Sequence, residues 1–315
     1  MIIRYDKDKN SKWSFYLKGI ANTIIPHSYF IKNREYFLNK YKNDGEFLSR
    51  LEYYNKTESF VLENESISIR EFYKVSKKTY FFDMIKTLKY FPSHFRFNYL
   101  FGDITYVPYA PTFLKSRPID EENNNSVILK LNSVRHYIFV KDDIPFDRKI
   151  SKAVWRGKCY KPHRQKFVQK FYDKNFCNIG QTNTKGNINV PWQKEKLSIS
   201  EQLKYKYIIS IEGNDVASNL KWAMSSNSLV MMAKPKYETW FMEGILKPNI
   251  DYVLLKDDYS DMEEKILYYN NHPKEAVEII NNSHNHVQKF LDDKKELALS
   301  IAVAKKYFLN CGYDI

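Results

Sequence analysis

The chain has 315 residues, of which 43% are hydrophobic and 16% are aromatic, and tyrosine is the most frequent aromatic residue. So much apolar side-chain surface excludes a disordered chain, and the length allows one large domain or two ordinary ones. The formal net charge of +13 favours an anionic partner, which can be nucleic acid, a membrane surface or a small substrate. The positive charges are dispersed, without a basic arm or a long Lys/Arg run, and this argues against nucleic acid.

Cysteine usage and the chain start bear on location. Cys159, Cys177 and Cys311 are far apart and odd in number, so a disulfide framework is not expected and a reducing compartment fits best. Residues 1–8 lack the apolar stretch of a signal peptide, and no apolar run approaches the ~20 residues of a membrane span. We therefore expect a cytoplasmic protein, and its charge leaves open a peripheral contact with an anionic membrane.

The first hundred residues are predicted to be helical and rich in aromatic side chains. Residues 29–41 and 46–54 repeat apolar residues at three- and four-residue spacing, which is typical of helices that bury one face. Downstream, we expect an extended stretch at residues 95–106 and a proline-rich ordered loop at 105–119. Two short strands are expected at 127–131 and 136–140.

Strands and helices alternate in the second half of the chain. Strands are predicted at residues 152–155, 176–179, 207–211, 229–232 and 252–255. Between them we expect three helices. The first spans 162–174, the second is short and begins at the capping box formed by Ser198 and Glu201, and the third spans 219–225. A closing helix is expected to be capped by Ser260, with Glu263 three residues later. This alternation is typical of a parallel sheet with helices on both faces, so residues 150–290 are predicted to form a Rossmann-type α/β domain.

Two turns that follow predicted strands carry the candidate binding residues, because ligands of such sheets lie beyond the carboxyl ends of the strands. The first turn precedes a helix and offers Arg156, Gly157, Lys158, Lys161 and Arg164. The second offers Gly213, Asp215, Ser218, Asn219 and Lys221, with Ser218 placed to cap the next helix. Helix N-termini and guanidinium groups both favour phosphate oxygens, so a diphosphate between the turns explains them. Ordinary capping with solvated cations is the alternative.

No metal site is predicted from the sequence. His284 and His286 lie two residues apart in a predicted helix and would point to different faces. The adjacent acidic pairs at 142–143 and 257–258 lack the DxD spacing of metal-dependent transferases, and we expect them to be surface charges. HExxH, Walker and GxGxxG motifs are also absent from the sequence.

Three ordered blocks of sequence resemble glycosyltransferase family 90. The matching residues are Trp155-Arg156-Gly157 with Pro162 and Arg164, then Tyr205-Lys206-Tyr207-Ile208 with Gly213, Lys221 and Ser228-Leu229-Val230, then Leu246-Lys247-Pro248 with Tyr252-Val253. The resemblance covers residues 95–310. The family includes Rumi-type protein O-glucosyltransferases, fungal capsule xylosyltransferases and bacterial lipopolysaccharide-modifying enzymes, and the short bacterial members resemble the chain best.

The resemblance implies a GT-B fold, in which two Rossmann-like domains face each other across a cleft, a UDP-sugar donor, no metal or other cofactor, and inversion at the anomeric carbon. Rumi-like members place an Asp before a Y-P-x-V-P stretch as general base, and Asp103 stands there in this chain, ahead of Val107-Pro108. The family has Arg where Asn219 stands, so Lys221 or Arg164 is expected to supply that charge. Glu238 or Glu243 is expected to accept the ribose hydroxyls.

The sequence therefore predicts an acceptor-side domain at 1–148, a nucleotide-sugar domain at 149–290 and a C-terminal helix at 291–315, for which packing on the first domain is one arrangement. The predicted function is transfer of glucose, xylose or another sugar from UDP to a glycan or glycolipid acceptor. Lipopolysaccharide or lipooligosaccharide core, at the cytoplasmic face of the inner membrane, is the expected acceptor. A noncatalytic protein that binds nucleic acid or anionic membrane, or a glycan-binding module on a transferase fold, is the alternative.

Overall fold

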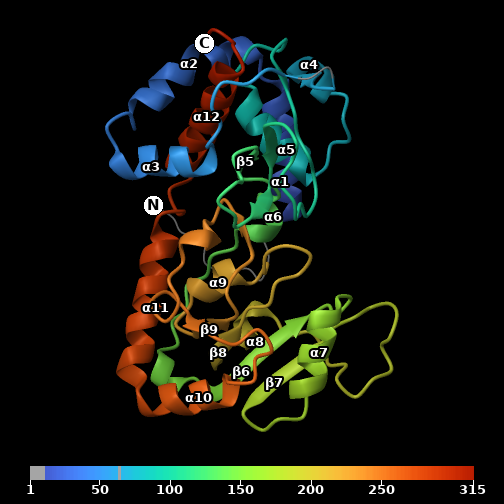
Figure 1. Cartoon of the computed structure of the whole chain (residues 1–315), viewed down its shortest axis with the longest axis vertical. Helices are drawn as coiled ribbons and strands as arrows, with labels where there is room; N and C mark the ends of the chain where they lie inside the picture. The colour runs from blue at the N-terminus through green and yellow to red at the C-terminus, as the bar shows by residue number, and fades with distance from the viewer. Residues whose placement is uncertain (1–10, 63–64) are drawn as a thin grey trace. The chain divides into compact units, whose positions relative to one another are not determined.

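The computed structural model describes residues 11–62 and 65–315, which divide into two compact units (Figure 1). Unit 1 comprises residues 136–235 and 244–289, and unit 2 comprises residues 11–135, 236–243 and 290–315. Residues 236–243, which the sequence analysis assigns to the nucleotide domain, thus belong to unit 2. The start of the chain, where no signal peptide is expected, lies outside the described residues.

Unit 1 is built on a parallel sheet with the strand order β11-β9-β8-β6-β7. Its strands are β6 (Ile150–Gly157), β7 (Cys177–Gln181), β8 (Tyr205–Ile209), β9 (Leu229–Met232) and β11 (Val253–Leu254). In the register of the sheet, Val154 of β6 lies opposite Ile208 of β8, which lies opposite Val230 of β9. At these positions the strands are apolar and buried, as expected for a sheet covered by helices. The predicted mixed α/β architecture with a parallel sheet is confirmed.

The helical segments of unit 1 are η1 (Phe146–Arg148), α7 (Pro162–Phe171), α8 (Ile199–Gln202), α9 (Leu220–Met224), α10 (Met262–Asn271) and α11 (Pro273–Gln288), with α6 (Ser133–His136) and η2 (Glu243–Ile245) at the boundaries between the units in the sequence. A buried cluster joins α7, α10 and α11 to the sheet, and in it Phe167 packs edge-on against Trp155. The capping box of α8 is confirmed. The predicted Ser260 cap is wrong, because α10 begins after Asp261 without a side-chain cap.

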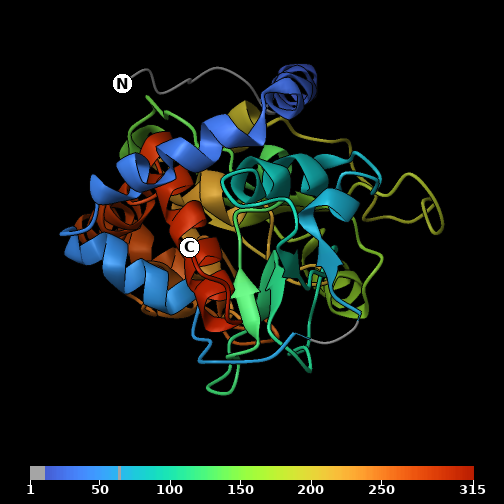
Figure 2. The ribbon, with the colours of Figure 1, turned by 90° about the horizontal axis from the view of Figure 1, so that it is seen from above.

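Unit 2 is mainly helical, as predicted. Its helices are α1 (Lys12–Ile24), α2 (His27–Asn39), α3 (Gly45–Tyr54), α4 (Ile69–Phe72), α5 (Thr79–Leu88) and α12 (Asp293–Asn310). Helix α12 packs against α2, α3 and α5, and Figures 1 and 2 both show it beside the first two of these. Trp240 stacks on Tyr54 at 3.9 Å between ring centres and donates to Glu296 of α12, so buried aromatic rings join segments distant in sequence.

Short strands complete unit 2. They are β1 (Ile67–Ser68), β2 (Arg96–Phe97), β3 (Thr112–Leu114), β4 (Ser116–Pro118), β5 (Ser126–Ile128) and β10 (Tyr237–Thr239). β3 pairs with β5 in parallel, and β4 pairs with β10 antiparallel. The proline-rich segment at 105–119 is therefore partly strand, which corrects the predicted loop. The predicted strand at 136–140 is wrong, because there the Val140 N–H donates to the Ser225 hydroxyl and not to a neighbouring strand.

A helix that crosses a bilayer must be both long and strongly apolar. Among residues 11–62 and 65–315, none of the helices is long and apolar enough to cross a bilayer.

Candidate active site

The two turns selected from the sequence lie at the same edge of the sheet in unit 1. β6 and β8 are adjacent and parallel, Gly157 is the last residue of β6, and Gly213 follows the last residue of β8, Ile209, by four positions. Parallel strands end at a common edge, so both glycines stand at the carboxyl ends of neighbouring strands, as predicted. This carboxyl edge is where ligands bind in sheets of this kind.

Arg164 of α7 joins the two turns. Its Nη1 donates to the carbonyl oxygen of Lys158 in the first turn at 3.2 Å. Its Nη2 and Nε donate to the carbonyl oxygens of Ile211 and Glu212 in the second turn, at 2.6 Å and 2.8 Å. The guanidinium also lies over the Trp155 ring, with the carbon at 5.6 Å from the ring centre. Arg164 therefore builds the edge, and its predicted contact with phosphate stays a prediction.

Gly157 is required by the tryptophan two residues before it. A methyl group at this position would come within 2.5 Å of Cζ2 in the Trp155 ring. Alternate residues of a strand point to the same face, so the ring folds back over the glycine. The Gly157 carbonyl oxygen accepts from the N–H of Thr182 at 2.9 Å. The Trp-Arg-Gly sequence thus shapes the end of β6 through packing.

Arg156 lies on the opposite face of β6 from Trp155, because strand residues alternate between the two faces. Its guanidinium donates to the carbonyl oxygens of Asn178 and Glu195 and to the side-chain oxygen of Asn178, at 2.7–3.0 Å. Burial lowers the pKa of this guanidinium. The structure therefore does not bring Arg156 to the face that carries Arg164, and its predicted role in donor binding stays a prediction.

The second turn is closed mainly by its own polar groups. The Gly213 N–H donates to the backbone carbonyl oxygen of Asp215, and Asp215 is buried. Asn219 donates to the carbonyl oxygen of Ile209 at 2.9 Å and accepts from the Ser210 hydroxyl at 3.2 Å. Asn219, and not Ser218, precedes α9 as its N-cap, and no side chain caps this helix, so the predicted Ser218 cap is wrong.

Two further groups of the turns differ in exposure. Lys221 in α9 is fully buried, and its ammonium lies 6.0 Å from the centre of the Tyr137 ring. Ser218 is exposed.

The exposed cations of the first turn stand where α7 begins. Lys158 and Lys161 are both exposed, and Lys161 is the N-cap residue of α7 without a side-chain cap. Pro162 at the first helical position lacks an N–H, while the next residues present theirs at the end of the helix. The partial positive charge of a helix N-terminus adds to these two ammonium groups. This part of the carboxyl edge can therefore attract an anion.

Asp103 belongs to unit 2, where Lys115 holds it. The Lys115 ammonium lies 2.5 Å from the Asp103 carboxylate, and the lysine side chain is 1% exposed while that of Asp103 is 27% exposed. Lys115 stands between β3 and β4, so the strands fix the ammonium and the ammonium fixes the carboxylate. Sequence reasoning missed Lys115, and its one signal was a lysine placed directly after the apolar pair Phe113-Leu114.

Glu238 and Glu243 also lie in unit 2. The Glu238 carboxylate accepts from Arg117 Nε at 2.7 Å and from the Tyr53 hydroxyl, and its side chain is 2% exposed. Glu243 accepts from the N–H of Thr239 at 2.7 Å. Both acids therefore make contacts that hold unit 2 together. Their predicted contact with the ribose stays a prediction.

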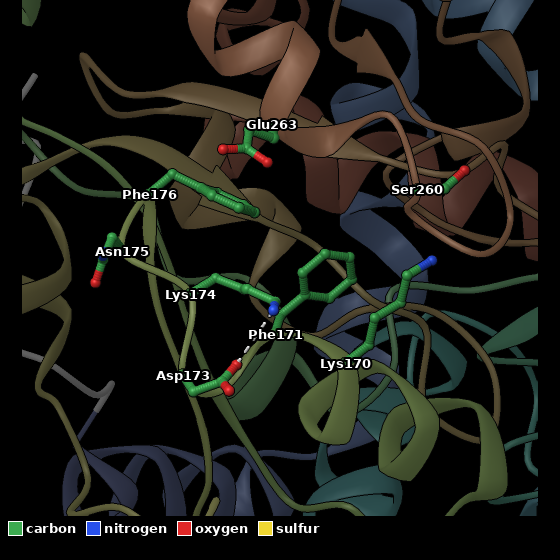
Figure 3. A pocket seen from close by; sticks show the side chains of 8 residues that line it. All are labelled: Lys170, Phe171, Asp173, Lys174, Asn175, Phe176, Ser260 and Glu263. Carbon is green, nitrogen blue, oxygen red and sulfur yellow. Dashed lines mark ion pairs between the residues drawn. The ribbon is translucent and has the colours of Figure 1, made fainter.

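A hollow of about 700 Å³ lies elsewhere in unit 1 (Figure 3). It is lined by Lys170, Phe171, Asp173, Lys174, Asn175, Phe176, Ser260 and Glu263. Most of these residues connect the end of α7 to the start of β7, so the hollow is at the amino end of that strand. The two turns are at the carboxyl edge, and the hollow is therefore not part of the candidate site.

The acidic pairs at residues 142–143 and 257–258 lie in unit 1. Asp143 and Asp258 are exposed, as predicted, but Asp142 is buried and pairs with Lys149 at 2.5 Å, which corrects its expected surface position. Asp142 also accepts from the N–H of Asn227. Within the part of the chain that the structure describes, no three His, Cys, Asp or Glu side chains gather as metal ligands would.

Comparison with known proteins identifies the family. The model of glycosyl transferase family 90 matches residues 125–308. The chain is 39% identical to O-glucosyltransferase LpsA of Dichelobacter nodosus over 303 residues, which cover 94% of this chain and 95% of that protein. It is 27% identical to Protein O-glucosyltransferase 2 of Danio rerio over 140 residues, covering 42% of this chain and 28% of that protein. Because the family model matches more than half of the chain, the chain belongs to glycosyl transferase family 90 and is a glycosyltransferase.

Proposed function

We propose that the protein is an inverting O-glucosyltransferase that takes its sugar from UDP-glucose, without a metal, and works as a GT-B enzyme with a cleft between two domains. The observation that carries the proposal is the similarity to a named O-glucosyltransferase along almost the whole chain. The parallel sheet of unit 1, with both turns at its carboxyl edge, supports a nucleotide site there.

The donor diphosphate is proposed to bind at the start of α7. Lys158 and Lys161 are exposed there, and Lys161 directly precedes the N-terminus of the helix, which carries a partial positive charge. As the bond from the sugar to UDP breaks, the leaving diphosphate gains negative charge, which these cations and the helix dipole would stabilise. In this proposal Arg164 holds the two turns in place, and a bound metal is not needed to neutralise the charge.

Asp103 is proposed as the general base. The acceptor hydroxyl attacks the anomeric carbon from the face opposite UDP, and its proton passes to the Asp103 carboxylate as the new C–O bond forms. UDP leaves with the electron pair of the old bond, so the configuration inverts. The Lys115 ammonium pairs with the carboxylate and holds it in place. The 27% exposure of Asp103 leaves it accessible to an acceptor.

The acceptor is proposed to be the core oligosaccharide of lipopolysaccharide, because the bacterial relative carries the name LpsA. Such an acceptor is a glycolipid, so we place the reaction at the cytoplasmic face of the inner membrane, with peripheral contact between the enzyme and anionic lipids. The net charge of +13 supports this contact.

The base is tested by Asp103→Asn, which keeps the shape of the side chain and removes the proton acceptor. We expect sugar transfer to core oligosaccharide to fall by at least ~10²-fold while UDP affinity stays nearly unchanged. The control is Asp143→Asn, at a carboxylate whose side chain is 78% exposed. Transfer by the Asp103 variant at close to the wild-type rate would show that the base is elsewhere.

The donor site is tested by calorimetry with UDP, with and without EDTA. Binding should survive the chelator, and the double variant Lys158→Ala/Lys161→Ala should weaken it about tenfold or more, since two charge-assisted contacts are lost. Arg156→Ala tests the other candidate cation of the first turn and should weaken binding if Arg156 contacts the diphosphate. If only Arg156→Ala has an effect, the diphosphate lies on the other face of β6, and if EDTA abolishes binding, the site uses a metal.

A further inference from the structure

Helix α1 has two apolar faces, and only one of them is packed inside unit 2. On the packed face, the rings of Phe15 and Tyr16 meet the Phe82 ring of α5 edge-on, at 6.3 Å and 5.6 Å between ring centres. Gly19 completes this contact, because a methyl group there would come within 2.4 Å of the Phe82 ring. Hence α1 is anchored on α5, beside which Figure 1 shows it.

The second apolar face of α1 consists of Trp13, Leu17 and Ile20, which are 78%, 55% and 50% exposed. Their spacing of four and three residues places them within about 60° of one another around a helix with 3.6 residues per turn. Single exposed hydrophobic side chains are common, but a contiguous exposed row marks a surface that meets another apolar phase.

The sequence of α1 and α2 is basic. Residues 11–42 contain six lysine or arginine residues and one acidic residue, Glu35. Lys12 and Lys18, on α1 itself, are exposed. On α2, the next helix in the sequence, Tyr29 and Tyr36 are 60% and 80% exposed. Exposed Trp, Leu and Ile with lysines beside them are the composition of a helix that lies in a membrane interface, and tyrosine suits the headgroup level.

We propose that the Trp13–Leu17–Ile20 face of α1 docks unit 2 onto an anionic lipid surface. The three side chains enter the boundary between headgroups and acyl chains, and Lys12 and Lys18 pair with lipid phosphates. This inference rests on the proposed function, which places the acceptor in a glycolipid, and it names the surface that would bring the enzyme to that acceptor. A second copy of the chain fits less well, because a twofold contact would place the same basic patch against itself.

The proposal is tested by co-sedimentation of the full chain with vesicles of phosphatidylcholine alone or mixed equally with phosphatidylglycerol. We expect binding to the anionic vesicles that weakens with salt, and at least tenfold weaker binding for Trp13→Ser/Leu17→Ser/Ile20→Ser. The matched control is Val61→Ser/Leu267→Ser/Val277→Ser, whose residues are 88%, 58% and 41% exposed and lie outside α1. The control should bind like the wild type.

Three results would overturn the proposal: no binding of the wild type to either vesicle, equal binding of the α1 variant, or a wild-type dimer that the α1 variant makes monomeric. If the α1 variant fails to fold, Lys12→Gln/Lys18→Gln replaces it and should still weaken binding to anionic vesicles; unchanged binding would overturn the proposal as well. Transfer to delipidated core oligosaccharide should be unchanged in the α1 variant. A wild type that binds anionic vesicles through α1 but transfers no sugar would contradict the proposed function alone.

Discussion

The half-buried Arg156 of unit 1 and two buried arginines of unit 2 are held in different ways. In unit 1, Arg156 bonds to carbonyl oxygens and to an amide oxygen, and in the described chain no carboxylate pairs with it. In unit 2, Arg50 pairs with Glu296 at 2.7 Å and Arg117 pairs with Glu238 at 2.7 Å, and all four side chains are at most 2% exposed. A buried charge must be compensated, and the two units do so with dipoles in one case and with opposite charge in the other.

The difference matters for anion binding. Carbonyl dipoles stabilise a guanidinium without cancelling its charge, so Arg156 remains a positive charge two residues before the exposed Lys158. An ion pair cancels most of the field, so the arginines of unit 2 hold the fold and leave little net charge. The comparison teaches that a basic residue near a site can act through its field while its hydrogen bonds go to the backbone.

The largest effect is expected from breaking the ion pair of unit 2. Arg117→Met leaves the Glu238 carboxylate buried without its cation, and we expect the free energy of unfolding to fall by about 3–5 kcal/mol in urea titrations. Lys170→Met, which removes an exposed pair with Asp258, should cost about 0–1 kcal/mol. The double variant Arg117→Met/Glu238→Met should recover most of the loss. If Arg117→Met and Lys170→Met lose the same free energy of unfolding, burial does not determine how much an ion pair contributes to stability.

A smaller effect is expected at the partly exposed pair of unit 2. Lys115→Met should lower kcat about 10- to 10²-fold at unchanged UDP affinity, because Asp103 loses the group that orients it. Lys115→Arg, which keeps the cation beside the carboxylate, should restore part of the rate. A rate that Lys115→Arg does not restore would make Lys115 a structural residue only.

The fold was largely predictable where local patterns decide the structure. Strand β9 lies at the predicted residues, and α7 begins at Pro162 as expected. Predictions failed where distant contacts decide. The short strands β3 and β4 depend on partners at residues 126–128 and 237–239, which no local pattern reveals.

The site was predictable only in part. The adjacency of Gly157 and Gly213 follows from the topology of parallel strands, and it was predicted. Which atoms the arginines meet was not, because a basic residue after a strand looks the same whether it binds phosphate or a carbonyl oxygen. Lys115 could not be assigned to Asp103, since the pair depends on how β3 and β4 fold against the loop before them.

Gly157→Ala tests whether the carboxyl edge of unit 1 is shaped by packing. The added methyl group collides with the Trp155 ring, which must move, and we expect a loss of about 1–3 kcal/mol in the free energy of unfolding. Gly45→Ala is the control, because a methyl group there meets nothing within 4 Å and alanine favours the helix that begins at this residue. If Gly45→Ala loses as much stability as Gly157→Ala, the collision with the Trp155 ring does not explain the loss.

A pH-dependent effect concerns Asp83, a buried carboxylate of unit 2 that accepts two hydrogen bonds from Ser133. It accepts from the N–H and the hydroxyl of Ser133, both at 2.7 Å, and burial raises its pKa to about 6 from an ordinary value of 3.8. A raised pKa in the folded state means that its contribution to stability is complete below pH 3.8 and is lost as the pH rises through about 6. Asp83→Asn cannot titrate, so the wild type should lose stability relative to it across this window in urea titrations at several pH values. Asp143→Asn is the control, at an exposed carboxylate. If the difference in unfolding free energy between the wild type and Asp83→Asn is the same at every pH, the hydrogen bonds from Ser133 compensate the buried charge as fully as an arginine does.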